Sequence, residues 1–187
     1  LTGVQVFATG GIGGVHREPA FDESADLLEL SRTPAIVVCA GAKSILDLPA
    51  TLERLESYGV PVIGYRSHEF PGFFTAETGL RVPAAAHTPE AIAKMAQAHW
   101  HTAGQSSALL VVQPPPAAAA LGRAEVDAVV AAAVEEASQR GIRGAALTPH
   151  LLAAIATATG GRSMTANLAL LEANAALAGA IAQALAA

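Results

Sequence analysis

The stretch that decides the fold begins at Val6 and leads to Lys43; its blocks read VFATGGIGGVHR (6–17), FDESADL (21–27) and VVCAGAKSILD (37–47). Val4–Ala8 and Ala35–Cys39 predict two strands, and the unbroken apolar run of the second is typical of a strand covered on both faces. A glycine turn follows the first strand, an acidic cluster comes next, and a lysine follows the second strand. The span thus combines a loop fit for an anion, metal-type carboxylates and one amine.

The rest of the chain alternates apolar strands with helical segments, which predicts a layered α/β/α fold with a mainly parallel or mixed central sheet. We expect a single domain over residues 1–187 that lacks N-terminal elements of its fold, because the chain enters a strand almost at once. A long loop over Arg66–Thr88, with Phe70, Phe73 and Phe74 as an apolar anchor or lid, should interrupt the alternation. The further strands are expected at 60–65 and 108–113, and the helices at 24–31, 44–58, 89–103, 123–140, 148–159 and 165–187, with Ser44 and Asp47 as a capping pair.

Composition narrows the function classes. The chain has 187 residues, of which 52% are hydrophobic and 14% charged, and its formal net charge is -5. A nucleic-acid polymer is therefore not an expected partner, because no basic stripe is present. The single cysteine, Cys39, excludes an internal disulfide and is expected in the core, with the cytoplasm as the default compartment. The apolar stretch 168–187 is alanine-rich and carries polar residues, so we expect a packing helix and no membrane partner.

The glycine turn matches neither of two common nucleotide motifs. A dinucleotide fingerprint that starts at Gly11 would end at His16, and a Walker loop would need glycine where Ala42 precedes Lys43. Two interpretations remain open. The turn could donate backbone N–H groups to an anion, with His16 and Arg17 beyond it, or it could need glycine for backbone reasons alone.

The acidic cluster Asp22, Glu23, Ser24 and Asp26 also has two interpretations. Oxygen-rich clusters suit divalent cations such as Mg²⁺ or Mn²⁺. Alternatively, Asp22 or Ser24 caps the following helix and the other side chains face water.

Lys43 lies between a buried strand and an expected helix start. The positive end of the helix dipole, together with burial, would disfavour an ammonium group and leave a neutral amine that can attack a carbonyl. Lys43 is therefore a Schiff-base candidate. The alternative is a surface lysine that extends from the strand end into water.

Taken together, these blocks resemble the pseudouridine-5'-phosphate glycosidase family, a group also known after indigoidine synthase A. The resemblance extends from Val6 almost to the C-terminus. Besides the three opening blocks, it is carried by TLERLESYGVPVIGY (51–65), FPGFF (70–74), TPHLL (148–152) and TGGRSMTAN (159–167).

The resemblance implies reversible cleavage of pseudouridine 5'-phosphate to uracil and ribose 5-phosphate. It implies that Lys43 forms an imine with the sugar and that Asp22 binds a divalent cation, typically Mn²⁺. It also implies a homotrimer. The residues implied to contact substrate are Ser24, Ala25, Asp26 and Asn167, with Thr9 and His16 near the phosphate and metal end.

The chain departs from the family pattern in ways that affect activity. The glutamate implied as proton donor and a second substrate-binding lysine have no counterpart in this sequence, Gln113 replaces a usual asparagine, and the connector between His16 and Asp22 is short. We therefore expect weak or no activity from this chain alone. The competing hypothesis is a non-catalytic phosphosugar-binding remnant; a nucleotide-dependent oxidoreductase is disfavoured by the failed fingerprint.

Overall fold

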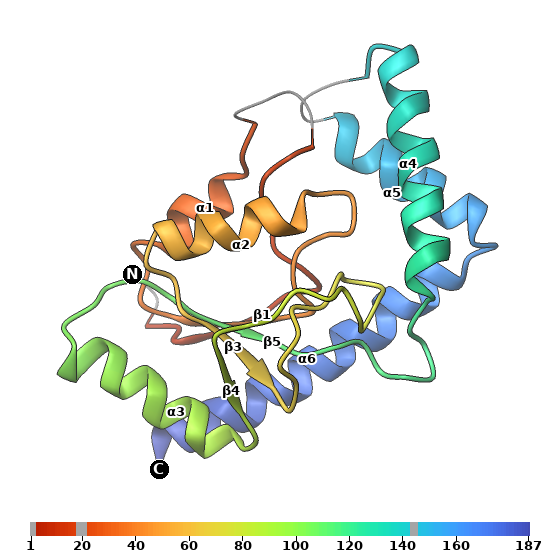
Figure 1. The fold of residues 1–187 in the computed structure, drawn as a ribbon. Coiled ribbons are helices and arrows are strands. Elements are labelled where there is room, and N and C mark those ends of the chain that lie inside the picture. Colours follow the sequence, from red (N-terminus) through yellow and green to blue (C-terminus); the bar gives the residue numbers. More distant parts are fainter. Residues whose placement is uncertain (1–2, 18–21, 143–145) are drawn as a thin grey trace.

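A five-stranded parallel sheet forms the centre of the fold in the computed structural model, which describes residues 3–17, 22–142 and 146–187. Its strands are β1 (Val6–Ala8), β2 (Ile36–Cys39), β3 (Val62–Tyr65), β4 (Ala84–Ala86) and β5 (Leu109–Val112). They lie in the order β1-β2-β5-β3-β4, and every neighbouring pair is parallel (Figure 1). The predicted α/β class is therefore confirmed.

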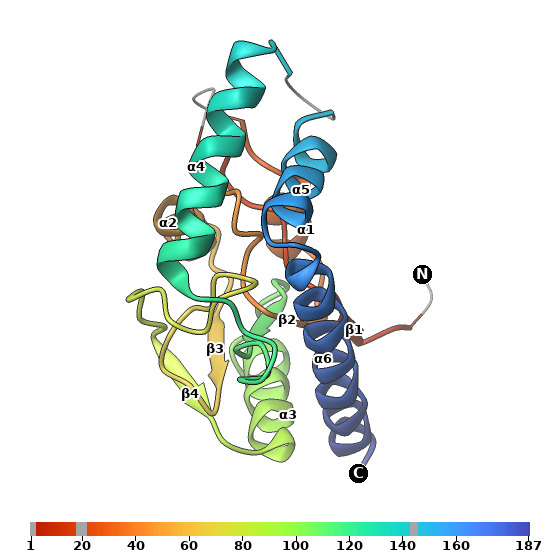
Figure 2. The ribbon, with the colours of Figure 1, turned by 90° about the vertical axis from the view of Figure 1, so that its right-hand side faces the viewer.

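Helices cover both faces of the sheet, as Figures 1 and 2 show from two directions. One face packs on α3 and α6, and the other on α1 and α2 together with the adjoining α4–α5 pair. The helices are α1 (Ala25–Leu30), α2 (Leu48–Ser57), α3 (Pro89–Gln97) with the π-helical turn η1 (Ala98–Thr102), α4 (Arg123–Gln139), α5 (Leu147–Ala158) and α6 (Arg162–Ala186).

The central strand β2 shows why its sequence is apolar throughout. Ile36 and Val38 belong to the core cluster on the α3–α6 side, whereas Val37 and Cys39 belong to the cluster on the opposite side. Successive side chains of a strand point to opposite faces, so a strand between two helical layers needs apolar residues at every position.

The C-terminal helix α6 is long and apolar enough to cross a membrane by length and composition alone. In the structure it packs along α3, β1 and β2 (Figure 2). Its buried face includes Leu170, Leu177 and Ile181, and it also includes Asn174, whose side chain bonds to the end of β1. One face of α6 therefore packs as the sequence predicts, whereas only 28% of its most apolar window is buried.

Two local predictions need correction. The segment 66–88 is not wholly irregular, because Ala84–Ala86 pairs with β3 and forms the edge strand β4. Three alanines have no intrinsic preference for a strand, so the pairing itself decides. Within the same segment, Phe70, Phe73 and Phe74 are buried, which confirms the apolar anchor.

The second correction concerns the start of α2. Asp47 alone caps this helix, accepting a hydrogen bond from the Ala50 amide at 3.0 Å. Ser44 lies in the preceding turn, and its buried hydroxyl makes no hydrogen bond with the described part of the chain. Because α2 begins only at Leu48, Lys43 does not sit at a helix start, and the dipole argument for its reactivity is wrong.

Cys39 should be unreactive in the native state. It is fully buried, and burial raises the pKa of its thiol to about 12. At pH 8 the reactive thiolate is therefore almost absent. We expect a thiol reagent such as DTNB to label Cys39 only in denaturant; rapid labelling of the native protein would contradict the burial.

Candidate active site

The glycine turn and the Lys43 loop form one bonded unit at the carboxyl ends of β1 and β2. The Ala40 amide donates to the Gly10 carbonyl at 2.8 Å, and the Ile12 amide donates to the Gly41 carbonyl at 3.0 Å. The Lys43 amide then donates to the Ile12 carbonyl at 3.2 Å. These backbone hydrogen bonds continue the parallel pairing of the two strands and fix Lys43 beside the turn.

The glycines are needed because other side chains press against the turn. A Cβ atom on Gly11 would come within 2.5 Å of the Phe73 ring, and one on Gly13 would overlap the Ser24 hydroxyl. The Gly13 amide donates to the Asp26 carboxylate at 2.7 Å, and the Val15 amide donates to the Thr51 hydroxyl at 3.0 Å. These amides are engaged within the protein, which favours the interpretation of the motif as a tight turn.

The acidic cluster does cap a helix, but its carboxylates do not simply face water. Ser24 is the N-cap of α1, and its hydroxyl accepts from the Asp26 amide at 3.2 Å. Glu23 pairs with Arg54 of α2 at 2.6 Å, and Asp26 holds the Gly13 amide. The cluster therefore fastens α1 to α2 and to the glycine turn.

Lys43 lines a cavity of about 440 Å³ between α1 and the edge of the sheet. The predicted residues Thr9 and Asp26 line the same cavity, so the fold brings these three together. Lys43 itself is half-buried. The remaining lining residues are Phe7, Gly11, Ile12, Glu29, Leu30, Thr33, Ala35, Val37 and Ala108.

The electrostatics of this cavity are mixed. Lys43 is the one cationic side chain among its described lining residues, and Asp26 and Glu29 are the carboxylates. A hydrogen bond from the Thr33 hydroxyl, with a second contribution from Arg32, lowers the pKa of Glu29, which therefore stays ionised at neutral pH. A phosphate group would meet one cation and two anions from this chain.

The other predicted residues are not among those that line this cavity. Asn167 extends from α6 toward the turn, and its Oδ1 lies 3.3 Å from the position of a Cβ on Gly10. His16 and Asp22 lie together, because the His16 amide donates to the Asp22 carbonyl at 2.9 Å. Ala25 is exposed at the start of α1. Within the described residues, no hydrogen bond or ion pair joins His16, Asp22 or Ala25 to Lys43, and connector residues 18–21 lie outside the described part of the chain.

The fit of a divalent cation depends on Asp22. Glu23 and Asp26 are engaged as described above, whereas the Asp22 carboxylate makes no hydrogen bond or ion pair within ranges 3–17, 22–142 and 146–187. The described residues contain no group of three or more His, Cys, Asp or Glu side chains that could form a protein cage. A single carboxylate suits a hydrated hard cation, which keeps several water ligands.

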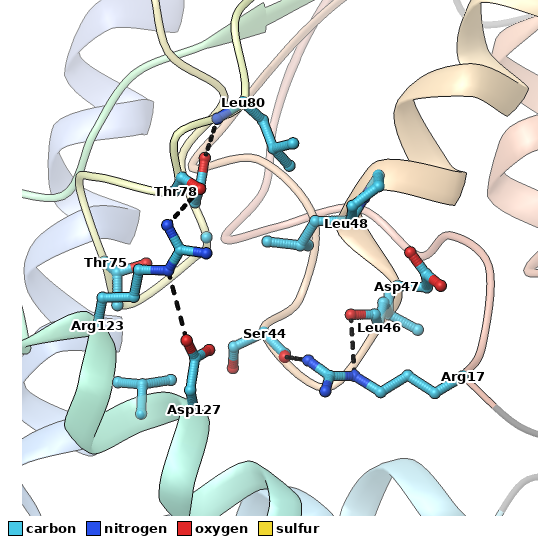
Figure 3. Close-up of a pocket in the computed structure, with 13 residues that line it drawn as sticks. Arg17, Ser44, Leu46, Asp47, Leu48, Thr75, Thr78, Leu80, Arg123 and Asp127 are labelled. Carbon is cyan, nitrogen blue, oxygen red and sulfur yellow. Dashed lines mark hydrogen bonds and ion pairs between the residues drawn. The ribbon is translucent and has the colours of Figure 1, made fainter.

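A second cavity of about 390 Å³ has Ser44, the residue after Lys43, in its lining (Figure 3). Its polar lining residues are Arg17, Ser44, Asp47, Thr75, Thr78, Arg123 and Asp127. Arg17 donates to the Leu46 carbonyl at 3.4 Å, and Arg123 donates to the Thr78 carbonyl at 2.5 Å. Both arginines already donate to backbone carbonyls, and no lysine is among the described residues that line this second cavity. The Lys43 cavity is the better candidate site because it holds an amine that can attack a carbonyl.

Three residues outside the predicted set of site residues also shape the site. Phe73 has a φ of 65° and packs its ring on the turn, which fixes the FPGFF segment against Gly11. Asn174 and Gln113 bond to each other at 2.9 Å, and Asn174 also bonds to the Thr9 carbonyl at 2.8 Å. A lone asparagine within the alanine-rich run 173–178 was the available signal for this network.

The chain is similar in sequence to curated proteins named pseudouridine-5'-phosphate glycosidase. The one from Gemmatimonas aurantiaca is 65% identical over 185 residues, which cover 99% of this chain and 60% of that protein. The one from Chloroflexus aurantiacus is 52% identical over 176 residues, covering 92% and 58%. The chain thus spans about 60% of the length of the curated relatives it matches.

Solved structures give the same result for the fold. The prealnumycin C-glycosynthase AlnA, in complex with ribulose 5-phosphate, matches with a TM-score of 0.91 and 41% identity over 98% of this chain and 61% of that one. An indigoidine synthase A-like protein from Thermotoga maritima matches with a TM-score of 0.88 and 38% identity over 96% and 59%. Residues 1–184 match the family described as indigoidine synthase A like protein. The chain therefore belongs to the indigoidine synthase A-like family.

Proposed function

We propose that this chain carries the lysine-bearing part of a site that cleaves the C-glycosidic bond of pseudouridine 5'-phosphate to uracil and ribose 5-phosphate. The observation that carries the proposal is the half-buried Lys43 in a cavity with Thr9 and Asp26. Relatives up to 65% identical are named for this activity. A neighbour 41% identical, named as a C-glycosynthase, binds ribulose 5-phosphate.

The proposed chemistry uses the Lys43 amine first as a nucleophile and then as the donor of the electron pair that expels the base. Nζ attacks C1' as the ring bond from C1' to O4' breaks; O4' keeps the electron pair of that bond and takes up the proton that the amine loses, so that it becomes a hydroxyl group on C4'. The nitrogen lone pair then forms the C=N bond while the C1'–C5 bond breaks, and its electron pair leaves with C5 of uracil, which takes up a proton. Water hydrolyses the imine and returns the free amine and ribose 5-phosphate. The covalent route through the Lys43 adduct replaces one difficult carbon–carbon cleavage with several easier steps.

The residues around Lys43 have distinct proposed roles. Thr9, Asp26 and Ser24 hold hydroxyl groups of the sugar, with Ala25, Asn167 and His16 as further substrate contacts. Asp22 would hold a hydrated Mn²⁺ or another divalent cation, which would supply charge neutralisation near the phosphate. The cavity's single described cation gives a physical reason for such an ion, because two carboxylates repel a phosphate.

A second candidate is a non-catalytic phosphosugar-binding protein with the same cavity. It shares the half-buried Lys43 and the cavity with the first candidate, and it differs in releasing no uracil. We propose that the chain alone binds the sugar and cleaves weakly or not at all. We further propose that it acts in the cytoplasm.

The test combines imine trapping with a cleavage assay. The chain would be incubated with ribose 5-phosphate and Mn²⁺, reduced with borohydride and mapped by peptide mass. The sequence has only two lysines, Lys43 and Lys94, so the modified amine can be assigned directly. An adduct on Lys43 without uracil release from pseudouridine 5'-phosphate supports an assembled but incomplete site. No adduct on folded protein would overturn the Lys43 proposal, and fast uracil release would overturn the proposed weakness of the isolated chain.

We also propose that the chain forms a homo-oligomer, which the family resemblance implies to be a trimer. Three large apolar side chains, Met164, Leu168 and Leu171, are exposed on α6. Their spacing places them along one stripe of the helix, and apolar stripes of this kind pack against partners. Light scattering on the eluting protein should give a multimeric mass that falls on Leu168→Glu; a monomeric mass at all concentrations would contradict the proposal.

A further inference from the structure

A buried amide on α6 joins three distant parts of the chain beneath the Lys43 cavity. Asn174 has no exposed surface. Its Nδ2 group donates to the Thr9 carbonyl at 2.8 Å and to the Gly10 carbonyl at 3.4 Å. Its Oδ1 accepts from the Nε2 group of Gln113, the residue after β5, at 2.9 Å.

Burying the Asn174 side-chain amide costs free energy, and its hydrogen bonds hold it in one orientation. An amide removed from water is tolerated only where its donor and acceptor find partners, and the Asn174 donor and acceptor both do. Gln113 fixes which way the amide faces, because its N–H occupies Oδ1 and leaves Nδ2 to meet Thr9. The network therefore sets the position of one peptide, Thr9–Gly10, relative to α6 and the end of β5.

That peptide is the link between β1 and the candidate site. The Thr9 side chain lines the cavity with Lys43. The Gly10 carbonyl also accepts from the Ala40 amide at 2.8 Å, where the loop to Lys43 begins. A shift of this peptide would move Thr9 and the Lys43 loop together.

We propose that Asn174, oriented by Gln113, is a positioning residue that holds the Thr9–Gly10 peptide in the geometry the sugar phosphate requires. The effect on ligand binding rests on the proposed function, whereas the local ordering of the turn does not. Asn174 lies behind the turn and acts through Thr9 rather than by touching substrate.

The decisive variant is Asn174→Asp, which keeps the shape but replaces the donor facing Thr9 with a carboxylate oxygen. Gln113→Asn is the milder variant, because it shortens the reach to Asn174 by one methylene and leaves the Thr9 bond possible. Leu177→Ala is the matched control. Leu177 is buried on the same helix and packs against the sheet, so its truncation destabilises α6 packing without touching Thr9.

Two measurements separate positioning from general stability. The first is amide hydrogen exchange of residues 9–15 in the ligand-free protein, with β3 as the internal reference. Relative to the amides of β3, the amides of the turn should exchange about tenfold faster or more in Asn174→Asp, and by a smaller factor in Gln113→Asn. In Leu177→Ala the ratio of the two exchange rates should stay unchanged. Equal acceleration in the turn and β3, or none in the turn, would overturn the proposal.

The second measurement is the ribose 5-phosphate concentration that gives half-maximal trapping on Lys43. This concentration should rise about tenfold in Asn174→Asp, because that variant loses one well-placed hydrogen bond. It should stay unchanged in Leu177→Ala. An equal rise in both variants would mean a merely structural role. If the unmodified chain gives no adduct, the proposed function fails, and hydrogen exchange still decides the positioning role. If Asn174→Asp does not fold, Gln113→Asn carries both measurements.

Discussion

Replacing Lys43 with arginine should abolish the borohydride-trapped sugar adduct while the protein remains folded. Arginine keeps a positive charge at this half-buried position, but its guanidinium cannot form an imine with C1'. If a longer form of the protein, or this chain, releases uracil, the rate should fall by about 10³-fold or more, as it does when a nucleophile is removed elsewhere. Intact mass after reduction and a uracil assay measure the two effects.

Lys94→Arg is the matched control for this prediction. Lys94 is exposed on α3, does not line the cavity and is the other lysine of the chain. This variant should retain the adduct in full. A Lys43→Met variant distinguishes the loss of the amine from a clash of the longer arginine. An adduct that persists in Lys43→Arg would show that another amine reacts, and the assignment of Lys43 would be wrong.

Replacing Gly41 with alanine should destabilise the fold and misplace Lys43. Gly41 has a φ of 79°, and a Cβ on it would overlap the Pro71 carbonyl oxygen. The left-handed backbone costs about 1–2 kcal/mol for a residue with a Cβ, and relief of the overlap adds about 1–3 kcal/mol. The free energy of unfolding should therefore fall by about 2–5 kcal/mol, measured by urea denaturation.

Gly59→Ala separates the two costs. Gly59 has a φ of 64°, close to that of Gly41, but its Cβ would meet no atom within 4 Å. This control should lose only about 1–2 kcal/mol, and its adduct on Lys43 should be unchanged. If the two variants lose equal stability, the contact between Gly41 and the FPGFF segment contributes nothing beyond backbone strain.

Local sequence patterns were sufficient for the layered architecture. The apolar runs at β2 and β5 indicate strands buried on both faces, because such strands cannot tolerate a polar position. The α4 and α5 ranges follow from glycine and proline signals, since these residues act on their own backbone. The pattern also placed Lys43 after β2, where parallel strands end at a shared edge.

Pairing between distant segments was not accessible to the same patterns. Ala84–Ala86 becomes β4 only because β3 offers an unpaired edge, and no local preference of alanine indicates a strand. The sequence also suggested a helix start next to Lys43, whereas the helix begins at Leu48 after a turn that Asp47 terminates. Short-range capping signals fix a helix boundary only where the side chain finds its amide.

The sequence by itself determined the alternation of strands and helices and the lysine that follows a buried strand, because both depend on residues close together in the chain. Only the tertiary structure decided which side chains surround Lys43. Asp26 is held by Gly13 across 13 positions, and Asn174 reaches Thr9 across 165. Hydrogen bonds of that span exist only after the sheet and α6 have packed, because folding must first overcome the entropy of closing such long loops.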